Sequence, residues 1–334
     1  MLTLKTEIET FELHSSFSIA RGANDSIDVI TVSISDSKYS GRGECRPYAR
    51  YDETPQNVCD LIASIKDNIE NGATRLELLD LLPAGAARNA VDCALWDLES
   101  KQTGKTVWEI IGGKGAIQPI PTVQTLSFLS PEEMAAKATQ HSAYNVLKVK
   151  LGGDNNDTER LQAIQQARPE AQLVIDANEG WTFDQLKKFI DQSQNSNIIM
   201  IEQPLPKDED DYLLDYDSGS IAICGDESIH DLNDVIAKKD FYNMMNIKLD
   251  KSGGLTHALQ MVDQIKQFNQ DRHAIKIMIG CMVCTSLAIA PHILLAQDCD
   301  LADLDGPGWL KHDRKGASSF NNGHINAGSL WGQG

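Results

Sequence analysis

The sequence predicts an α/β protein in which a (β/α) barrel follows a smaller α+β domain. Its 334 residues exceed one ordinary domain but suit a barrel of about 200 to 250 residues with a smaller partner. The first part of the chain has the pattern of strands followed by helices, whereas from about residue 118 short apolar runs alternate with amphipathic stretches. The later apolar runs also end in charged residues at regular intervals, as successive βα units would.

The α+β domain is expected to begin with strands over residues 2–46. Residues 30–34 (ITVSI) alternate apolar and polar side chains, which is typical of a half-buried strand. The stretch 55–70 then places apolar residues on one helical side, and the stretch 84–100 is rich in small residues suited to a buried helix. Strands followed by helices form a unit distinct from the alternating pattern after it.

Composition excludes several kinds of partner. Forty-eight acidic residues against thirty basic ones give a net charge of −18, and no block of Lys and Arg interrupts this excess. Nucleic acids and anionic membrane surfaces are therefore poor partners. The first residues lack the apolar core of a secretory signal, and no apolar run reaches the length of a membrane span, so a cytoplasmic location is expected.

The cysteines agree with a reducing compartment. Seven cysteines, an odd number scattered along the chain, favour free thiols over a disulfide framework. Cys281 and Cys284 form a C-x-x-C pair that could serve redox or zinc chemistry. No second pair completes a zinc site, and the apolar neighbours of this one indicate packing.

Five ionisable residues mark the ends of successive apolar runs, at intervals of 26, 26, 24 and 22 residues: Lys150, Asp176, Glu202, Asp226 and Lys248. Such an interval is about one βα unit. In a barrel the C-terminal ends of the strands share one face, where catalytic groups sit. A single such charge could be an ordinary solvated strand end, but five in register predict a common mouth. An open doubly wound sheet is the competing architecture, yet no glycine-rich phosphate loop follows a strand here.

Three of these five residues are carboxylates, which would repel one another in a partly dry pocket. A hard dication resolves that repulsion, and three protein oxygens leave about three octahedral positions for water and substrate, as Mg²⁺ prefers. Calcium usually takes more ligands, and zinc favours His or Cys, neither of which ends one of these runs. The predicted metal ligands are Asp176, Glu202 and Asp226.

The two lysines flank the acids in strand order, so they would approach a bound ligand from opposite sides. Two bases facing one carbon imply epimerisation beside a carboxylate, with Lys150 and Lys248 as the bases. The ordinary lysine pKa of about 10.4 is too high for this task, but burial and a nearby cation can lower it towards about 7 to 8. Lys148 would supply that cation. Lys148 and Lys150 could instead be charges that protect an edge strand.

With these residues in place, the chain resembles the muconate-lactonising subgroup of the enolase superfamily over essentially its whole length. The family motifs are present as K-x-K at 148–150, D-x-N at 176–178, E-Q-P at 202–204, D-E-S at 226–228 and N-I-K at 246–248. The resemblance implies a (β/α)₇β TIM-like barrel over residues 116–309. It also implies an N-terminal α+β capping domain over residues 1–115, which the segment 310–334 completes.

Within that subgroup the chain is similar to dipeptide epimerases of the L-Ala-D/L-Glu type. Segments 19–22, 83–90 and 280–286 carry this similarity, together with a D-x-D formed by Asp303 and Asp305. The resemblance implies that these two carboxylates hold the substrate's ammonium group, and that the substrate is a murein-peptide fragment.

Two further substrate contacts follow less directly. Arg21, in the loop 16–24, is the candidate partner for the glutamate side chain, although Asn24 stands where some relatives have an arginine. Ser286 is a candidate for binding the substrate backbone or, alternatively, for capping a helix. The expected partner is a small dipeptide, and barrels of this family are often homo-oligomers.

Other functions remain as alternatives. A lyase of the o-succinylbenzoate synthase or cycloisomerase kind would use the same lysines and metal, but its substrates lack an ammonium group for Asp303 and Asp305. Acid-sugar dehydratases of the superfamily place a histidine on the seventh strand, whereas the run 276–280 has none. A non-catalytic binding barrel would not need both lysines and all three acids.

Overall fold

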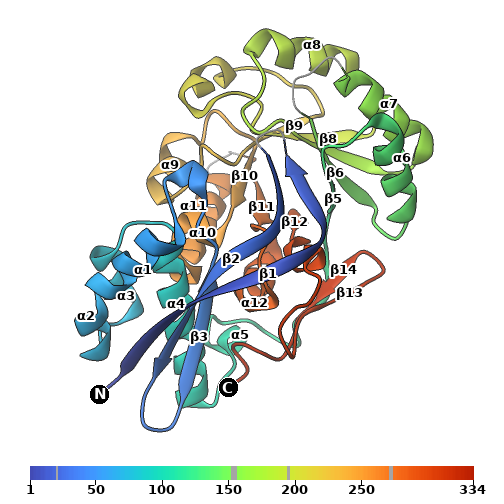
Figure 1. The fold of residues 1–334 in the computed structure, drawn as a ribbon. Helices are drawn as coiled ribbons and strands as arrows, with labels where there is room; N and C mark the ends of the chain where they lie inside the picture. Colours follow the sequence, from blue (N-terminus) through green and yellow to red (C-terminus); the bar gives the residue numbers. More distant parts are fainter. Residues whose placement is uncertain (20–21, 152–155, 194–195, 271–273) are drawn as a thin grey trace.

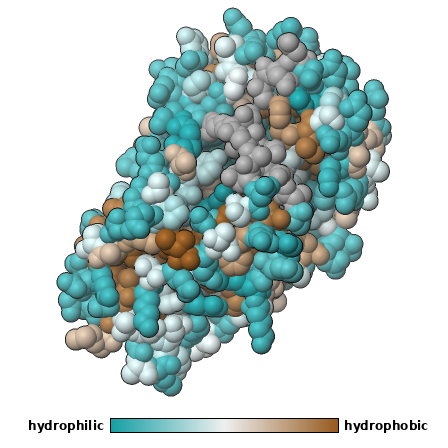
Figure 2. Space-filling view, viewed as in Figure 1, coloured by the Kyte–Doolittle hydropathy of each residue, from teal (hydrophilic) through white to brown (hydrophobic). Residues whose placement is uncertain are grey.

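The computed structural model describes residues 1–19, 22–151, 156–193, 196–270 and 274–334. Figure 1 shows an N-terminal sheet with its helices lying beside an eight-stranded parallel barrel. Hydrophilic residues cover most of the face drawn in Figure 2, in keeping with the net charge of −18. Within the described residues, no helix combines the length and the apolar character needed to cross a membrane.

The N-terminal sheet consists of three antiparallel strands, β1 (Thr3–Ile19), β2 (Gly22–Ser35) and β3 (Ser40–Cys45). Its helices are α1 (Pro55–Ser64), α2 (Lys66–Glu70), α3 (Arg75–Leu81), α4 (Ala86–Thr103) and α5 (Val107–Ile110). Helix α4 lies directly on β3, because a Cβ atom at Gly41 or Gly43 would collide with backbone carbonyls of that helix. The small residues predicted to form a buried helix thus permit close helix–sheet packing.

Eight parallel strands follow in chain order and form one sheet, as a barrel requires. They are β5 (Gln124–Leu126), β6 (Val146–Lys150), β7 (Gln172–Asp176), β8 (Ile198–Glu202), β9 (Ala222–Gly225), β10 (Met244–Ile247), β11 (Lys276–Gly280) and β12 (Leu301–Asp303). The first and last strands meet where Val123 N donates to Ala302 O at 2.9 Å. The predicted TIM-like barrel with an N-terminal α+β unit is therefore confirmed.

The outer layer of the barrel contains helices α6 (Pro131–Gln140), α7 (Asp157–Ala167), α8 (Phe183–Ser193), α9 (Leu232–Ala237), α10 (Leu249–Ser252), α11 (Leu255–Gln270) and α12 (Ser286–Leu295). Short 3₁₀ segments are η1 (Ala49–Tyr51), η2 (Lys207–Leu213), η3 (Ala296–Asp298) and η4 (Gly306–Trp309). A large apolar core fills the space between strands and helices, as expected for parallel strands buried on both faces.

The barrel interior explains why the acidic residues converge. Val174, Met200 and Cys224 belong to one small cluster of buried side chains contributed by five strands. Because successive side chains of a strand alternate between faces, the residues two positions later share that inward face. These residues are Asp176, Glu202 and Asp226, at the C-terminal ends of β7, β8 and β9.

The end of the chain returns to the N-terminal domain. Strands β13 (Ser319–Asn321) and β14 (His324–Asn326) form a small sheet with β4 (Ile120–Pro121). Beyond it, Trp331 Nε1 donates to Cys93 O at 3.0 Å, and Gly332 N donates to Asp97 Oδ1 at 2.8 Å. The terminal residues thus pack on α4, while the division of the chain at residues 115 and 310 stays a prediction.

Candidate active site

A cavity lies where the N-terminal domain meets the C-terminal ends of the barrel strands. The segment after β3 and the 3₁₀ turn η1 contribute Arg46, Tyr48 and Tyr51. The barrel contributes the remaining lining residues, among them Lys148, Lys150, Asp226, Lys248, Asp303 and Asp305.

Three acids lie side by side at this end of the barrel. Asp176 and Glu202 are the last residues of β7 and β8, Asp226 directly follows β9, and at most 3% of each is exposed. Burial and the charges of Asp176 and Asp226 raise the pKa of Glu202 to about 7, although Lys148 opposes the shift. Burial would also raise the pKa of Asp176, but the ammonium groups of Lys148 and Lys150 hold it well below its ordinary value.

The ammonium group of Lys148 lies between two of these acids and a further carboxylate, that of Asp303. Its Nζ is 2.7 Å from Glu202 Oε2, 3.1 Å from Asp176 Oδ2 and 2.8 Å from Asp303 Oδ2. In the described part of the chain, no three His, Cys, Asp or Glu side chains form a ready cage for a metal ion. The lysine instead supplies the positive charge that three neighbouring carboxylates need.

The donor set nevertheless fits Mg²⁺. It consists of three buried carboxylates at adjacent strands, and one ammonium group spans two of them, so an oxygen of Asp176 and an oxygen of Glu202 face a common point. Among the described residues, buried Glu202 Oε2 has an ionic contact with Lys148 and no hydrogen-bond donor besides it. A hard dication satisfies such oxygens better than a single ammonium group does.

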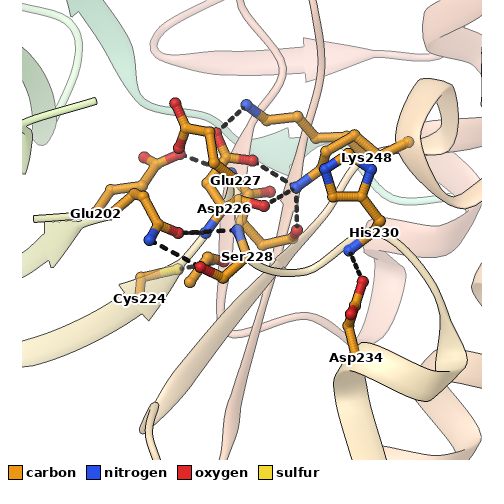
Figure 3. Close-up of polar contacts among 12 residues, drawn as sticks. Glu202, Cys224, Asp226, Glu227, Ser228, His230, Asp234 and Lys248 are labelled. Atoms are coloured by element: carbon orange, nitrogen blue, oxygen red, sulfur yellow. Dashed lines mark hydrogen bonds and ion pairs between the residues drawn. The ribbon is translucent and has the colours of Figure 1, made fainter. Parts of the chain in front are cut away.

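The two predicted bases stand at opposite ends of the acid row. Lys150, the last residue of β6, places its Nζ 2.5 Å from Asp176 Oδ2. Lys248, directly after β10, places its Nζ 2.6 Å from Asp226 Oδ2. Figure 3 shows Lys248 reaching Asp226, with Glu202 close by. Three strands separate the two lysines, yet both line the same cavity.

The charge state of Lys248 differs from the expectation of a lowered pKa. Burial alone would lower this pKa, but the charges of Asp226 and Glu202 raise it well above the usual lysine value. The pKa of Lys148 is raised in the same way, by Asp176, Asp303 and Glu202 against the effect of burial. Both upward pKa shifts arise from the negative charges of neighbouring carboxylates.

Neighbouring polar side chains hold the acids in place. Buried Gln203 accepts a hydrogen bond from Asp226 N at 2.9 Å, and its φ of 35° turns the chain sharply after β8. Asn246 Nδ2 donates to Glu202 Oε1 at 2.9 Å. Gly280 leaves space for this asparagine, because a Cβ there would lie 2.5 Å from Asn246 Oδ1. The close approach of Asn246 thus explains why a glycine ends β11.

Asp303 and Asp305 form a second acidic pair on the cavity wall. Asp303 is the last residue of β12, and its contact with Lys148 places an ammonium group against this carboxylate. Asp305 Oδ2 accepts a hydrogen bond from Thr125 N at 2.8 Å. Burial and the charge of Asp303 raise the pKa of Asp305 to about 6. Two such buried acids favour a cationic ligand group between them.

Of the predicted substrate residues, one does not line the cavity and another lies outside the described residues. Ser286 is the first residue of α12, and its Oγ donates to Asp313 Oδ2 at 2.5 Å and accepts from Ser318 N at 3.0 Å. It is not among the residues that line the cavity, and the helix cap is the preceding Thr285, so a role of Ser286 in binding the substrate stays a prediction. Arg21 lies outside the described residues.

The structure adds residues that the motifs alone did not assign. Asn178 Oδ1 accepts a hydrogen bond from Lys150 Nζ at 3.1 Å, and its φ is 44°. Its place in the D-x-N motif was the available signal. Arg46 and Tyr51 also line the cavity, but they come from the N-terminal domain and belong to none of the motifs.

Comparison with known proteins identifies relatives over the full length. The chain is 40% identical to L-Ala-D/L-Glu epimerase of Escherichia coli (strain K12), covering 97% of this chain and 99% of the relative. It is also 40% identical to N-acetyl-D-glutamate racemase of a Pseudoalteromonas species, covering 91% and 95%.

Solved structures of similar proteins also match this chain over nearly its full length. One match is an enolase family member from Agrobacterium tumefaciens with homology to dipeptide epimerases, whose structure holds sodium and L-Ala-L-Glu. Its TM-score is 0.94 and its identity 41%, and the match covers 99% of this chain and 100% of that one. Dipeptide epimerase from Enterococcus faecalis V583, complexed with Mg and L-Leu-L-Tyr, matches with a TM-score of 0.89 and 27% identity, covering 99% and 98%.

Two family models together account for most of the sequence. The N-terminal domain of mandelate racemase and muconate lactonizing enzyme matches residues 1–112, and the enolase C-terminal domain-like model matches residues 132–334. The chain belongs to the mandelate racemase and muconate lactonizing enzyme family of the enolase superfamily.

Proposed function

We propose that the protein is a dipeptide epimerase that interconverts L-Ala-L-Glu and L-Ala-D-Glu by moving the α-proton of the glutamate residue. The observation that carries this proposal is the placement of Lys150 and Lys248 at opposite ends of one row of buried acids. Relatives with the names L-Ala-D/L-Glu epimerase and dipeptide epimerase support it.

In this mechanism one lysine removes the proton from the glutamate α-carbon, and the other, in its ammonium form, returns a proton to the opposite face. Lys148 stands beside the substrate carboxylate and favours its negative charge. Loss of the α-proton moves charge onto the carboxylate oxygens, where fixed positive charge stabilises it.

Magnesium would be held by Asp176, Glu202 and Asp226. When bound, it supplies positive charge next to the substrate carboxylate. It would also compensate the acids whose charge raises the pKa of Lys248. With that charge compensated, Lys248 can be neutral at a lower pH and act as a base.

The amino group of the dipeptide would be recognised by Asp303 and Asp305. Both acids are buried, and a charge-assisted hydrogen bond to an ammonium group is stronger than a neutral one.

We include in this proposal a murein-peptide origin of the substrate, a cytoplasmic location and a possible homo-oligomer. The seven free cysteines support a reducing compartment.

Proton exchange provides the direct test. Purified protein with Mg²⁺ and L-Ala-L-Glu in D₂O is expected to incorporate deuterium at the glutamate α-carbon and to form L-Ala-D-Glu, both visible by NMR. The alanine α-proton should remain, because only the glutamate α-carbon lies beside the free carboxylate. Absence of exchange with every Ala-Xaa dipeptide would rule out the proposed reaction.

Racemisation of an N-acylated glutamate is a second candidate. It is favoured by the 40% identity to an N-acetyl-D-glutamate racemase and by the pairing of Asp303 with Lys148, which a ligand without an ammonium group would leave undisturbed. Both candidates use the same lysines and acids. They differ only in what Asp303 and Asp305 must bind.

The Asp303→Asn variant separates these candidates. If the carboxylate binds an ammonium group, KM for L-Ala-L-Glu should rise at least about tenfold, whereas KM for N-acetyl-L-Glu should change much less. Steady-state kinetics on both compounds measures the difference. An equal change for the two compounds would show that Asp303 does not recognise the amino group.

A further inference from the structure

Four cationic side chains line the cavity, and one of them lacks a carboxylate partner. Lys148, Lys150 and Lys248 each form an ion pair with an acid. Arg46 forms none: over the described part of the chain its guanidinium group makes a single hydrogen bond, from Nη1 to Val283 O at 3.1 Å. Arginine carries five N–H donors, so four of them have no partner among the described residues.

The fold holds this arginine firmly at the junction of the two domains. Arg46 directly follows β3, and its backbone N–H donates to Asp250 Oδ1 at 3.1 Å, in the helix α10 just after Lys248. Its side chain reaches Val283, in the loop after β11. The guanidinium group is therefore fixed beside the strand ends that carry the chemistry.

The surroundings of Arg46 are partly dry. Burial lowers the pKa of its guanidinium group from the usual value, which indicates that surrounding water has been lost. Arginine nevertheless stays charged in proteins. A charged, partly desolvated group with free donors favours an anion, and the planar fork of arginine matches a carboxylate through two parallel hydrogen bonds.

Of the charged groups of the proposed dipeptide substrate, only one has no partner yet and can bind Arg46. The α-carboxylate of glutamate belongs next to the acids and lysines where the α-proton moves, and the ammonium group belongs at Asp303 and Asp305. The side-chain carboxylate of glutamate is the charge that remains. Asp305 and Arg46 line the same cavity, as a dipeptide that contacts both would require.

We propose that Arg46 binds the side-chain carboxylate of the substrate and thereby determines the preference for glutamate. The inference rests on the proposed function and deepens it. It gives the specificity role expected of Arg21 to a residue from a different part of the N-terminal domain.

Selectivity measurements with the Arg46→Met variant test this inference. For L-Ala-L-Glu, kcat/KM is expected to fall at least about 30-fold, mainly through KM, because charge-assisted hydrogen bonds are lost. For L-Ala-L-Met, whose side chain is uncharged and of similar length, kcat/KM should stay within about threefold of the wild-type value. Arg46→Lys keeps the charge without the fork and should show a smaller loss.

Arg42→Met is the matched control. Arg42 lies on β3, four residues earlier, and its Nη2 donates to Leu330 O at 3.2 Å, away from the cavity. Removing this charge should leave the preference for L-Ala-L-Glu over L-Ala-L-Met unchanged. An equal loss of this preference in Arg42→Met and Arg46→Met would mean that the net charge of the protein, and not a contact with Arg46, determines the preference.

Two results would overturn the inference. One is an equal loss for both dipeptides in Arg46→Met. The other is an unchanged preference for L-Ala-L-Glu in Arg46→Met, whether or not Arg21→Met loses that preference. If Arg46→Met does not fold, Arg46→Lys still decides, since full retention of the preference with unchanged KM contradicts a bidentate contact.

Failure of the proposed function is distinguishable from failure of this inference. If wild-type protein exchanges no dipeptide proton but racemises N-acetyl-L-Glu, the dipeptide proposal fails, and N-acetyl-L-Glu and N-acetyl-L-Met take the place of the two dipeptides in the same comparison. If the wild type exchanges L-Ala-L-Glu normally and Arg46→Met keeps its selectivity, the inference alone fails. Inactivity of the wild type towards both kinds of compound overturns both.

Discussion

Replacing Lys150 or Lys248 with alanine is expected to lower the rate of epimerisation by about 10² to 10⁴-fold, the usual contribution of a general acid or base. Each lysine serves one face of the glutamate α-carbon, so loss of either interrupts inversion in both directions. The loss should appear in kcat, since neither lysine is needed to hold the ammonium group at Asp303.

Isotope exchange reveals a difference that the overall rate hides. In D₂O, a protein that has lost one lysine should still exchange the α-proton of one epimer of Ala-Glu, while the other epimer remains unlabelled. The second lysine variant should show the opposite pattern. Mass spectrometry or NMR of each epimer, incubated separately, measures this asymmetry.

The matched control is Lys187→Ala, which removes an exposed lysine paired with Asp184 on the outside of the barrel. It should epimerise and exchange at the wild-type rate. Equal residual exchange of both epimers in the Lys150→Ala and Lys248→Ala variants would contradict opposed bases, because each variant would then still reach both faces of the carbon.

Much of the barrel was predictable because charged residues recur in the sequence at the ends of successive strands. Asp176 and Glu202 are the last residues of β7 and β8, and Lys150 is the last residue of β6. The spacing between these residues along the sequence is about one βα unit, which indicates that they end successive strands of a parallel sheet. The inward direction of these side chains follows from alternation along each strand, which a sequence also displays.

The parts that could not be predicted depend on contacts between distant segments. Arg46 follows the last strand of the N-terminal sheet, and no spacing connects it with Val283, some 240 residues later. The hydroxyl group of Ser286 donates a hydrogen bond to Asp313, a partner in the C-terminal segment that no local sequence pattern indicates. Lys148 was expected to act on Lys150, whereas its ammonium group contacts three acids.

Removing divalent cations with EDTA is expected to abolish activity, with a loss of more than about 10³-fold that Mg²⁺ restores. Without the cation, the charges of Asp226 and Glu202 hold Lys248 in its ammonium form, which cannot accept a proton. Activity that persists after chelation, with the metal content checked by elemental analysis, would contradict a role for the cation.

The Glu202→Gln variant tests the metal ligands by binding and not only by activity. It should weaken Mg²⁺ binding, measured by calorimetry, at least about tenfold, because a neutral amide replaces a carboxylate ligand. Glu209→Gln makes the same change at an exposed position of η2, after the same strand, and should bind Mg²⁺ like the wild type. Equal Mg²⁺ affinity in all three proteins would remove Glu202 from the ligand set.

The acidity of Glu202 adds a pH dependence to this affinity. Its pKa of about 7 in the metal-free protein means that the carboxyl group is increasingly protonated as pH falls below 7. Metal binding requires the ionised form, so a bound cation must displace this proton. Wild-type affinity for Mg²⁺ should therefore be lower at pH 6 than at pH 8, whereas Glu202→Gln, which has no proton to release there, should lose most of this difference.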